Sequence, residues 1–375
     1  MNALDWHQPE PAPLLRLSPT HANALLACQK QAAFRGDPST ADLSRPSTRT
    51  ALGSAAHTLI ECVLTGEVPP PEERRKWLES KWEAAIQDEA LSLAQAWPDR
   101  VIPTTRTWPG LTATRRRLIK RLEQLSPVAP RAKDVNAPQN SDHIPALPWV
   151  ERWIEDPVTG LIGKPDLITE AQGRIQVVDH KTGVHQDGIR EGQRRQLLIY
   201  AHLASVALGH LPDEAIVLDA RGREEGFEIN ANEVEETVKA AVAALRDFEA
   251  SRSAGSFTAS PSPEICRYCP YRTVCLDYWT ARDSSETVDN WSANDLRGVA
   301  IPHQVDNVVT VASGEINVQV VLTAGVYLDK ETELVATDLD RNGAHGARMR
   351  WNSLIRTAST SNAPKLTSEE TLGRP

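Results

Sequence analysis

The first hundred residues carry apolar side chains at helical spacing. In the segment 15–35, LRLSPTHANALLACQKQAAFR, apolar positions recur every three or four residues, and Ser18 offers an N-terminal cap. A second helix is predicted over 48–66, where it opens with a turn of small residues. A third is predicted over 71–97, where a proline start precedes acidic residues and many strong helix formers.

The next segment, 98–147, is rich in proline and is predicted to form loops around one helix. Its basic side chains crowd around a tryptophan, Trp108, and they are Arg106, Arg115, Arg116, Arg117, Lys120 and Arg121. Such a cluster either contacts nucleic acid or is the solvated face of a surface helix, and the sequence leaves both interpretations open.

From residue 148 the pattern changes to short β-rich runs separated by turn sequences such as DPVTG and EAQGR. These runs predict three antiparallel strands at about 149–155, 160–168 and 174–181. A helix is expected over 191–208, followed by a strand pair (EAIVLDA and EGFEIN) and an amphipathic helix that starts EVEETVKAA. This succession indicates an α/β fold with a mixed β-sheet flanked by helices.

The chain after residue 285 has a different, β-rich texture. Four strands are predicted in VDNVVTVAS, INVQVVLTAGVYLD, TELVATDLD and RMRWNSLIRTA. They form either a small five-stranded barrel of the oligonucleotide-binding (OB) kind or a β-extension that packs on the main domain. The predicted domains are therefore residues 1–284, with a helical insertion at about 67–147, and a β-rich module over 285–360. The tail, 361–375, is expected to be disordered.

Composition limits the setting in which this fold works. The chain has 375 residues, of which 40% are hydrophobic, which suffices for one large domain with an appendage or for two domains. No apolar run is long enough to span a bilayer and no leader is recognisable, so a cytoplasmic protein without membrane contact is expected. Because the net charge is −9, any binding of nucleic acid needs a local basic surface.

The cysteines favour a metal centre over disulfides. In a reducing cytoplasm, five cysteines, an odd number, do not suggest a disulfide framework. Cys266, Cys269 and Cys275 have C-x2-C-x5-C spacing, and Cys62 lies in the apolar stretch HTLIECVL as an expected core thiol. Cys28, at the end of the apolar run of the first helix, is therefore the expected fourth ligand. Four thiolates suit either a [4Fe–4S] cluster or a structural Zn²⁺.

Two carboxylates and a lysine stand out in the strand region IGKPDLITEAQGRIQVVDHKTG. Asp166 lies in one predicted strand and Asp179 in the next, with Lys181 on the same strand face as Asp179. Two facing carboxylates among apolar residues prefer a divalent cation between them, and oxygen ligands select Mg²⁺ or Mn²⁺. The lysine can then orient or deprotonate a water, or counter charge on a phosphate. The plainer alternative is an ordinary Asp–Lys ion pair at a strand end.

Two further motifs accompany these residues. GSAAHTLIE contains His57 behind a glycine turn, and RRQLLIYAH contains Gln196 and Tyr200, four residues apart on one helix face. The order G-x-x-x-H, G-x-x-D, D-x-K, Q-x-x-x-Y resembles the RecB-type branch of the PD-(D/E)xK nuclease superfamily, over about residues 15–280. One departure is that the third motif more often carries Glu at the position of Asp179.

The resemblance implies a restriction-endonuclease-like core with a catalytic Mg²⁺ or Mn²⁺. It also implies the following roles for residues of this chain: metal ligands His57, Asp166 and Asp179, catalytic residues Asp166, Asp179 and Lys181, and substrate contacts Gln196 and Tyr200.

The split cysteine set is similar to that of the iron–sulfur members of the RecB-like group, among them AddB-type helicase–nucleases and the nucleases of CRISPR adaptation. This similarity implies a [4Fe–4S] cluster, with Zn²⁺ as the alternative. The cluster would staple the two ends of the chain around the sheet and so restrict the unfolded chain. Its role would be structural, because hydrolysis needs no electron transfer.

Together these features predict a metal-dependent DNA nuclease, an exonuclease on single strands or DNA ends in repair, recombination or phage defence. Arg115, Arg116, Arg117 and the C-terminal module are expected to contact the strand. Because the sequence has no G-x-x-x-x-G-K-[ST] loop, unwinding would need a helicase or defence-complex partner. Two other hypotheses stay open: a nucleic-acid-binding or complex-forming subunit with a degenerate nuclease core, and a zinc-stapled hydrolase with a different substrate.

Overall fold

A computed structural model of the chain describes residues 6–66, 68–98, 100–125, 146–181, 188–285, 291, 294–303, 307–314, 316–322, 331–341 and 346–358. The chain divides into two compact units. The larger unit comprises residues 10–38 and 45–258, and the C-terminal unit comprises 1–9, 39–44 and 259–375. The predicted boundary at 284–285 thus lies 26 residues beyond the point at which the chain leaves the larger unit, after residue 258. The tail expected to be disordered, 361–375, lies outside the described residues.

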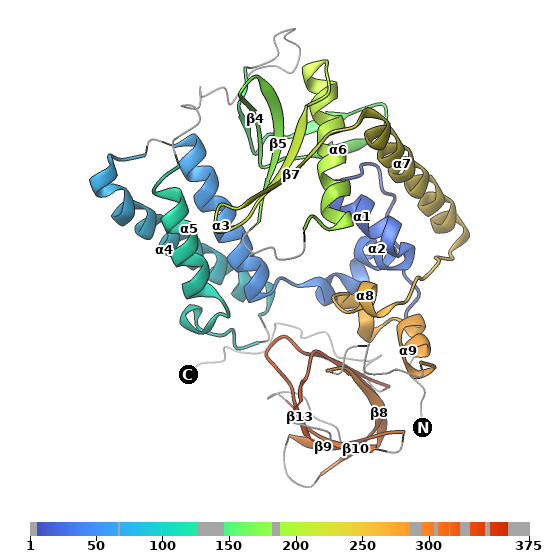
Figure 1. The fold of residues 1–375 in the computed structure, drawn as a ribbon. Helices are drawn as coiled ribbons and strands as arrows, with labels where there is room; N and C mark the ends of the chain where they lie inside the picture. The colour runs from blue at the N-terminus through green and yellow to red at the C-terminus, as the bar shows by residue number, and fades with distance from the viewer. Residues whose placement is uncertain are drawn as a thin grey trace, which may run out of the picture. The chain divides into compact units, whose positions relative to one another are not determined.

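A five-stranded mixed sheet forms the centre of the larger unit (Figure 1). Its order is β1-β4-β5-β6-β7, in which β5 and β6 are parallel and the other neighbours are antiparallel. A separate hairpin pairs β2 with β3. The strands are β1 (Trp149–Val150), β2 (Ile154–Asp156), β3 (Leu161–Gly163), β4 (Leu167–Ala171), β5 (Arg174–His180), β6 (Glu214–Leu218) and β7 (Glu224–Glu228).

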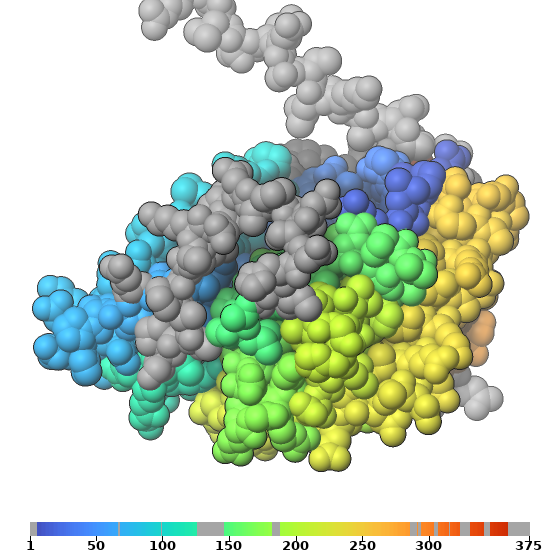
Figure 2. Space-filling model, turned by 90° about the horizontal axis from the view of Figure 1, so that it is seen from above, coloured from blue at the N-terminus to red at the C-terminus, as the bar shows by residue number. Residues whose placement is uncertain are grey.

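Two groups of helices lie on opposite sides of these strands (Figure 1). One group holds α1 (Pro19–Ala27), α2 (Gln29–Gly36), α6 (Glu191–Leu208) and α7 (Ala231–Ala254). The other holds α3 (Thr48–Thr65), α4 (Pro71–Ala96) and α5 (Leu111–Leu122), near the short turn η2 (Thr105–Thr107). Figure 2 shows the same division from above, with the light blue and teal of α4 and α5 on one side and the yellow of α7 on the other. The predicted α/β architecture with a helix-flanked mixed sheet is confirmed.

The apolar core of the larger unit lies between the sheet and α6. Buried residues along α6, among them Leu197 and Leu203, pack against Val177 and the neighbouring strands. Gly163 lets the β2–β3 hairpin approach this helix, because a Cβ atom there would lie 2.8 Å from Tyr200 Cε1 and 2.9 Å from Leu203 Cδ1. The motif glycine therefore has a packing role beside the helix that carries Tyr200.

The prediction of one continuous helix over 15–35 is wrong. The chain forms α1 and α2, and Cys28 between them has an extended backbone with φ −160° and ψ 107°. Strong helix formers surround Cys28, so local propensity does not account for the interruption. The break holds Cys28 outside both helices, where it ends α1 and begins α2.

Two of the predicted strands are also each divided. The run 149–155 becomes β1 and β2, and the run 160–168 becomes β3 and β4, which belong to different sheets. Glu151 turns the chain out of β1 with a left-handed φ of 48°, and Pro165, which has no N–H to donate, separates β3 from β4. Asp166 therefore precedes a strand, although the sequence analysis placed it within one.

The C-terminal unit contains a seven-stranded sheet with the order β12-β13-β10-β9-β8-β11-β14. The prediction of four strands missed β8, did not separate β12 from β11, and overlaps β13 only at Arg348, because RMRWNSLIRTA otherwise supplies β14 alone; a five-stranded OB barrel is not what the described residues form. The elements are α8 (Pro263–Cys266), η3 (Pro270–Thr273), α9 (Leu276–Asp283), β8 (Leu296–Pro302), β9 (Val308–Ser313), β10 (Ile316–Val321), β11 (Thr332–Thr337), β12 (Asp340–Arg341), β13 (Gly346–Arg348) and β14 (Leu354–Thr357). One short turn, η1 (Pro38–Ser44), precedes α3.

No helix within the described ranges combines the length and the apolar character that a membrane crossing requires.

Candidate active site

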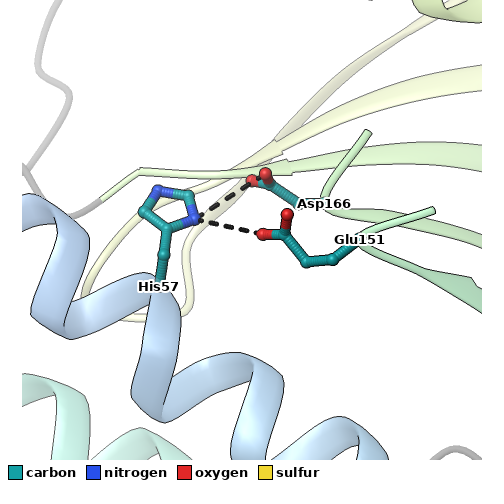
Figure 3. Close-up of side chains that lie close together, drawn as sticks. All are labelled: His57, Glu151 and Asp166. Atoms are coloured by element: carbon teal, nitrogen blue, oxygen red, sulfur yellow. Dashed lines mark ion pairs between the residues drawn. The ribbon is translucent and has the colours of Figure 1, made fainter. Parts of the chain in front are cut away.

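Three side chains from separate elements meet at the edge of the main sheet (Figure 3). His57 lies on α3, Glu151 directly follows β1, and Asp166 directly precedes β4. His57 Nδ1 lies 3.7 Å from Asp166 Oδ1 and 3.9 Å from Glu151 Oε1. One ligand atom from each residue lies within 4.8 Å of the others, so the three side chains could bind one metal ion.

The strand register brings a third carboxylate to the same place. Val150 pairs with Leu167 and Leu167 pairs with Val178, so one step further Glu151, Asp166 and Asp179 form a row across β1, β4 and β5. Two backbone hydrogen bonds fix this row. Glu151 N donates to the carbonyl oxygen of Asp166 (3.1 Å), and His180 N donates to Asp166 Oδ2 (2.6 Å).

Asp179 connects this row to a lysine and to helix α6. The Lys181 ammonium lies 2.9 Å from Asp179 Oδ1 and 2.7 Å from Oδ2. Gln196 Nε2 on α6 donates to Asp179 Oδ1 and to the Tyr200 hydroxyl, each at 3.4 Å. The structure therefore brings together Asp179, Lys181, Gln196 and Tyr200 as the motif order predicted.

The crowding of acidic groups changes the protonation of the site. Burial, and then the charge of Asp179, raise the pKa of Asp166 to about 8, although its hydrogen bond from His180 N acts in the opposite direction. Burial lowers the pKa of His57 in spite of the neighbouring Glu151 carboxylate. Near pH 7 the site thus holds a neutral imidazole, which can accept a metal, and a carboxyl group that keeps its proton until positive charge arrives.

This constellation can be compared with known families. The sequence model of the PD-(D/E)XK nuclease superfamily matches residues 16–276. The chain belongs to the PD-(D/E)XK nuclease superfamily. Membership implies metal-dependent nuclease activity and DNA as the molecule bound. The superfamily predicted from the motif order is thus confirmed, while the RecB-type iron–sulfur branch stays a prediction.

No curated protein matches the sequence. The solved structure of SSO0001 matches with a TM-score of 0.27 and 18% sequence identity, and the match covers 59% of this chain and 85% of that one.

The donor set fits the divalent metal that PD-(D/E)XK nucleases use. His57 offers one imidazole nitrogen, and Glu151 and Asp166 offer carboxylate oxygens, which are hard ligands suited to Mg²⁺ or Mn²⁺. The pKa of Asp166 is raised first by burial and second by repulsion from the neighbouring carboxylates. A cation at this site would offset that repulsion.

Glu151 is the site residue that the sequence analysis missed. It lies beside His57 and Asp166, in the place for which Asp179 had been predicted as the third ligand. Its second carboxylate oxygen, Oε2, lies 2.5 Å from Lys164 Nζ. A usable signal was present, because the charged Glu151 directly follows the apolar pair Trp149–Val150 at a strand end. Its position in the row depends on the pairing of β1 with β4, which an isolated acidic residue does not reveal.

On the opposite face of β5, Arg121 of the predicted basic cluster reaches the strand that carries the D-x-K motif. Arg121 Nη2 lies 2.9 Å from His180 Nδ1, and its Nη1 donates to the carbonyl oxygen of Asp219 at 3.2 Å. His180 is buried, and burial followed by the charge of Arg121 lowers its pKa to about 3. Arg121 therefore supports the strand of the candidate site from its opposite face, with a neutral histidine as its partner.

The three arginines predicted to bind nucleic acid differ in their surroundings. Arg115 lies near two carboxylates of α4, with Nη1 at 3.6 Å from Glu83 and Nη2 at 3.9 Å from Glu79. Arg116 is exposed on α5 and Arg117 is half-buried. Arg116 is thus the most accessible of the three to an incoming phosphate.

The cysteines occupy two units. Cys28 lies between α1 and α2 in the larger unit, and Cys266, Cys269 and Cys275 lie around α8, η3 and α9 in the C-terminal unit. Burial, and then the negative charges of Cys275 and Cys266, raise the pKa of the Cys269 thiol to about 12. The fifth cysteine, Cys62, is half-buried on α3.

We expect Mn²⁺ to raise the thermal unfolding temperature of the protein by an amount that grows between pH 6 and pH 8. Below its raised pKa Asp166 is protonated, so binding a cation must release that proton, and the affinity rises up to about tenfold per pH unit in this window. The pKa of His57 is lowered by burial, so this imidazole contributes less to the pH dependence than a free histidine would. Differential scanning fluorimetry with and without Mn²⁺ measures the effect, and Asp166→Asn should remove its pH dependence. An Mn²⁺ shift that is constant across this range in the wild type would contradict the assignment.

Arg121→Met should lower the free energy of unfolding by about 1–3 kcal/mol, because it leaves His180 Nδ1 and a carbonyl oxygen without their donor. The matched control is Arg116→Met on the exposed face of the same helix, for which a change below about 0.5 kcal/mol is expected. Urea unfolding curves of both variants make the comparison, and equal effects would show that Arg121 does not support the strand.

Proposed function

We propose that this chain is a Mg²⁺- or Mn²⁺-dependent deoxyribonuclease that acts as an exonuclease on single strands or DNA ends. The observation that carries the proposal is the convergence of His57, Glu151 and Asp166 next to the Asp179–Lys181 pair. Superfamily membership supports a nuclease, and the finer assignment rests on this geometry. Because the sequence has no phosphate-binding loop of the helicase type, we also propose that any unwinding comes from a partner, in repair, recombination or phage defence.

In this proposal His57, Glu151 and Asp166 hold the cation, with Asp179 beside them in the row across the sheet. When bound, the cation supplies a Lewis acid that activates water and offsets charge on the phosphate. The chain's own residues orient the reaction. Asp179 holds the Lys181 ammonium, which offers positive charge and a donor to a phosphate oxygen or to the attacking water.

Helix α6 gives the site its rigidity. The Gln196 amide bridges Asp179 and the Tyr200 hydroxyl, and burial raises the pKa of Tyr200, so that hydroxyl keeps its proton and remains a donor. We propose that Gln196 and Tyr200 contact the substrate strand at this point, as the motif implies. Exposed Arg116, with Arg115 and Arg117 on the same helix, would bind the backbone phosphates beyond it.

We further propose that Cys28, Cys266, Cys269 and Cys275 ligate a [4Fe–4S] cluster, with Zn²⁺ as the alternative. Two observations support this. The interruption at Cys28 leaves its thiol outside a regular helix, and burial, followed by the charges of Cys275 and Cys266, raises the pKa of the Cys269 thiol in spite of the neighbouring Arg272. Thr258, eight residues before Cys266, is also hydrogen-bonded to the two residues that follow Cys28. Lys30 N donates to Thr258 O (3.0 Å), and Thr258 N donates to Gln29 Oε1 (2.9 Å).

A buried arginine organises the loop that bears these three cysteines. Arg272 Nη1 lies within 2.6–3.2 Å of the carbonyl oxygens of Cys266, Arg267 and Cys269. Its other nitrogens bind Asp295 (2.7 Å) and Asp338 (2.8 Å), residues of the β-rich part of the same unit. The cysteine loop is therefore preformed by contacts with the β-module, as a binding site for a metal centre would require.

Lys181→Ala and Asp166→Ala should each lower Mn²⁺-dependent cleavage of 5′- and 3′-labelled single-stranded and duplex DNA by at least about 100-fold, because each removes a group placed at the reacting phosphate. Both should keep the far-UV circular dichroism of the wild type. Lys239→Ala, on the exposed face of α7, is the matched control and should cleave normally.

Unchanged cleavage by either active-site variant would refute the assignment of that residue. If the wild type binds labelled DNA but forms no products at any Mg²⁺ or Mn²⁺ concentration, the alternative of a nucleic-acid-binding subunit with a degenerate nuclease core is favoured.

Serine substitution of any one of the four proposed ligand cysteines should lower the iron content of anaerobically purified protein, together with the broad absorption near 400 nm typical of thiolate-bound iron. Cys62→Ser is the internal control, because this thiol lies on α3 and is not among the proposed ligands. Elemental analysis measures both metals. A colourless wild-type protein that retains zinc would replace the cluster with Zn²⁺, and normal metal content in Cys28→Ser would remove Cys28 from the ligand set.

A further inference from the structure

Trp153 is the most exposed of the large aromatic side chains of the larger unit that the structure describes, with 66% of its surface accessible. It lies in the three-residue connection between β1 and β2, and Ile154 next to it is buried in the core. A tryptophan combines a large apolar surface with a polar N–H group, so an indole that stays in water can be covered by a binding partner.

The connection that carries Trp153 also carries a residue of the candidate metal site. Glu151 is two residues before Trp153, and two residues of chain span at most about 7 Å. In the β2–β3 hairpin Ile154 pairs with Gly163, so one step further Trp153 lies opposite Lys164, whose ammonium binds Glu151. The backbone of Trp153 therefore lies within about 7 Å of the residue that supplies the metal-site carboxylate, and opposite the lysine that binds it.

The backbone keeps the indole outside the core. Glu151 has a left-handed φ of 48°, a conformation that a non-glycine residue adopts only when its surroundings impose it. The adjacent Arg152 places its guanidinium 4.6 Å from the centre of the Trp149 ring, which is buried. Trp149 and Ile154 anchor the two ends of the connection in the core, and Trp153 between them faces solvent.

We propose that Trp153 is a stacking platform for an unpaired base of the DNA strand, one or two nucleotides from the phosphodiester at the His57–Glu151–Asp166 site. This inference rests on the proposed nuclease function and names the substrate class, single-stranded DNA. Successive nucleotides of a stacked strand are about 3.4 Å apart, so the span of about 7 Å from Glu151 corresponds to one or two of them.

Stacking explains why an aromatic residue occupies this place in an acidic chain. Every base has a π-face, so an indole binds a strand without regard to its sequence. It also selects single strands, because the base faces of a duplex are already stacked on their neighbours. Trp153 would thereby hold a strand by its bases next to a site whose own side chains are mostly anionic.

The test is a double-mutant cycle between the protein and the DNA. Full-length Lys181→Ala protein, in which cleavage is expected to be blocked, is titrated with Mn²⁺ and a fluorescein-labelled single strand, and binding is followed by anisotropy. A series of strands carries a single abasic nucleotide that moves along the sequence. Adding Trp153→Ala should weaken binding of the intact strand by about 5- to 150-fold, and Trp153→Phe should retain most of the affinity.

The decisive result concerns the abasic series. With Trp153 present, one abasic position should weaken binding by a factor similar to that of Trp153→Ala, and that position should have no effect once Trp153 is replaced. Equal effects of Trp153→Ala on intact and abasic strands, or no effect at all, would overturn the proposal. Trp77→Ala, a half-buried tryptophan on α4, is the control and should leave affinity unchanged. Cleavage by the wild type is measured separately, so absence of products would refute the nuclease function without deciding the stacking.

Discussion

The repulsion among three neighbouring carboxylates is the constraint on which the rest of this structure depends. Glu151, Asp166 and Asp179 lie in one row across three strands, and in the part of the chain that the structure describes Lys164 and Lys181 form ion pairs with them. A protein gains no stability from such a row, as the raised pKa of Asp166 shows. A fold that maintains the row against this cost has a site made to receive a cation, and superfamily membership agrees with that conclusion.

Strand β5 connects the candidate site to both groups of helices. Its alternating side chains point Asp179 toward α6, where Gln196 binds it, and point His180 toward α5, where Arg121 binds it. Since His180 N also holds Asp166, one strand joins a metal-site carboxylate to two helices on opposite faces. The helical segment before the sheet therefore supports the strand of the candidate site and is also a candidate surface for DNA.

Much of the site could be predicted because the motifs combine chemistry with order along the chain. The resemblance carried by the motif order picked out His57, Asp166, Asp179 and Lys181, and the structure brings His57 next to Asp166 and Lys181 next to Asp179. Glu151 and Arg121 could not be assigned in this way, because the residues that they contact lie elsewhere along the chain. In the sequence, Glu151 resembles any acidic residue at a strand end, and Arg121 resembles any arginine on a basic helix. The strand count of the C-terminal unit failed for a related reason, since β8 joins the sheet only through its pairing with β9 and β11.

The sequence by itself determined the alternation of helix and strand, the superfamily, and the acidic and basic groups that the chemistry needs. These features follow from side-chain periodicity and from short spacings, which act within a few residues of chain. Only the tertiary structure decided that Glu151 stands beside His57, that Arg121 faces inward, and that Trp153 stays in solvent. Those outcomes depend on strand register and on a left-handed turn at Glu151, and both are set by pairing between segments that lie far apart along the chain.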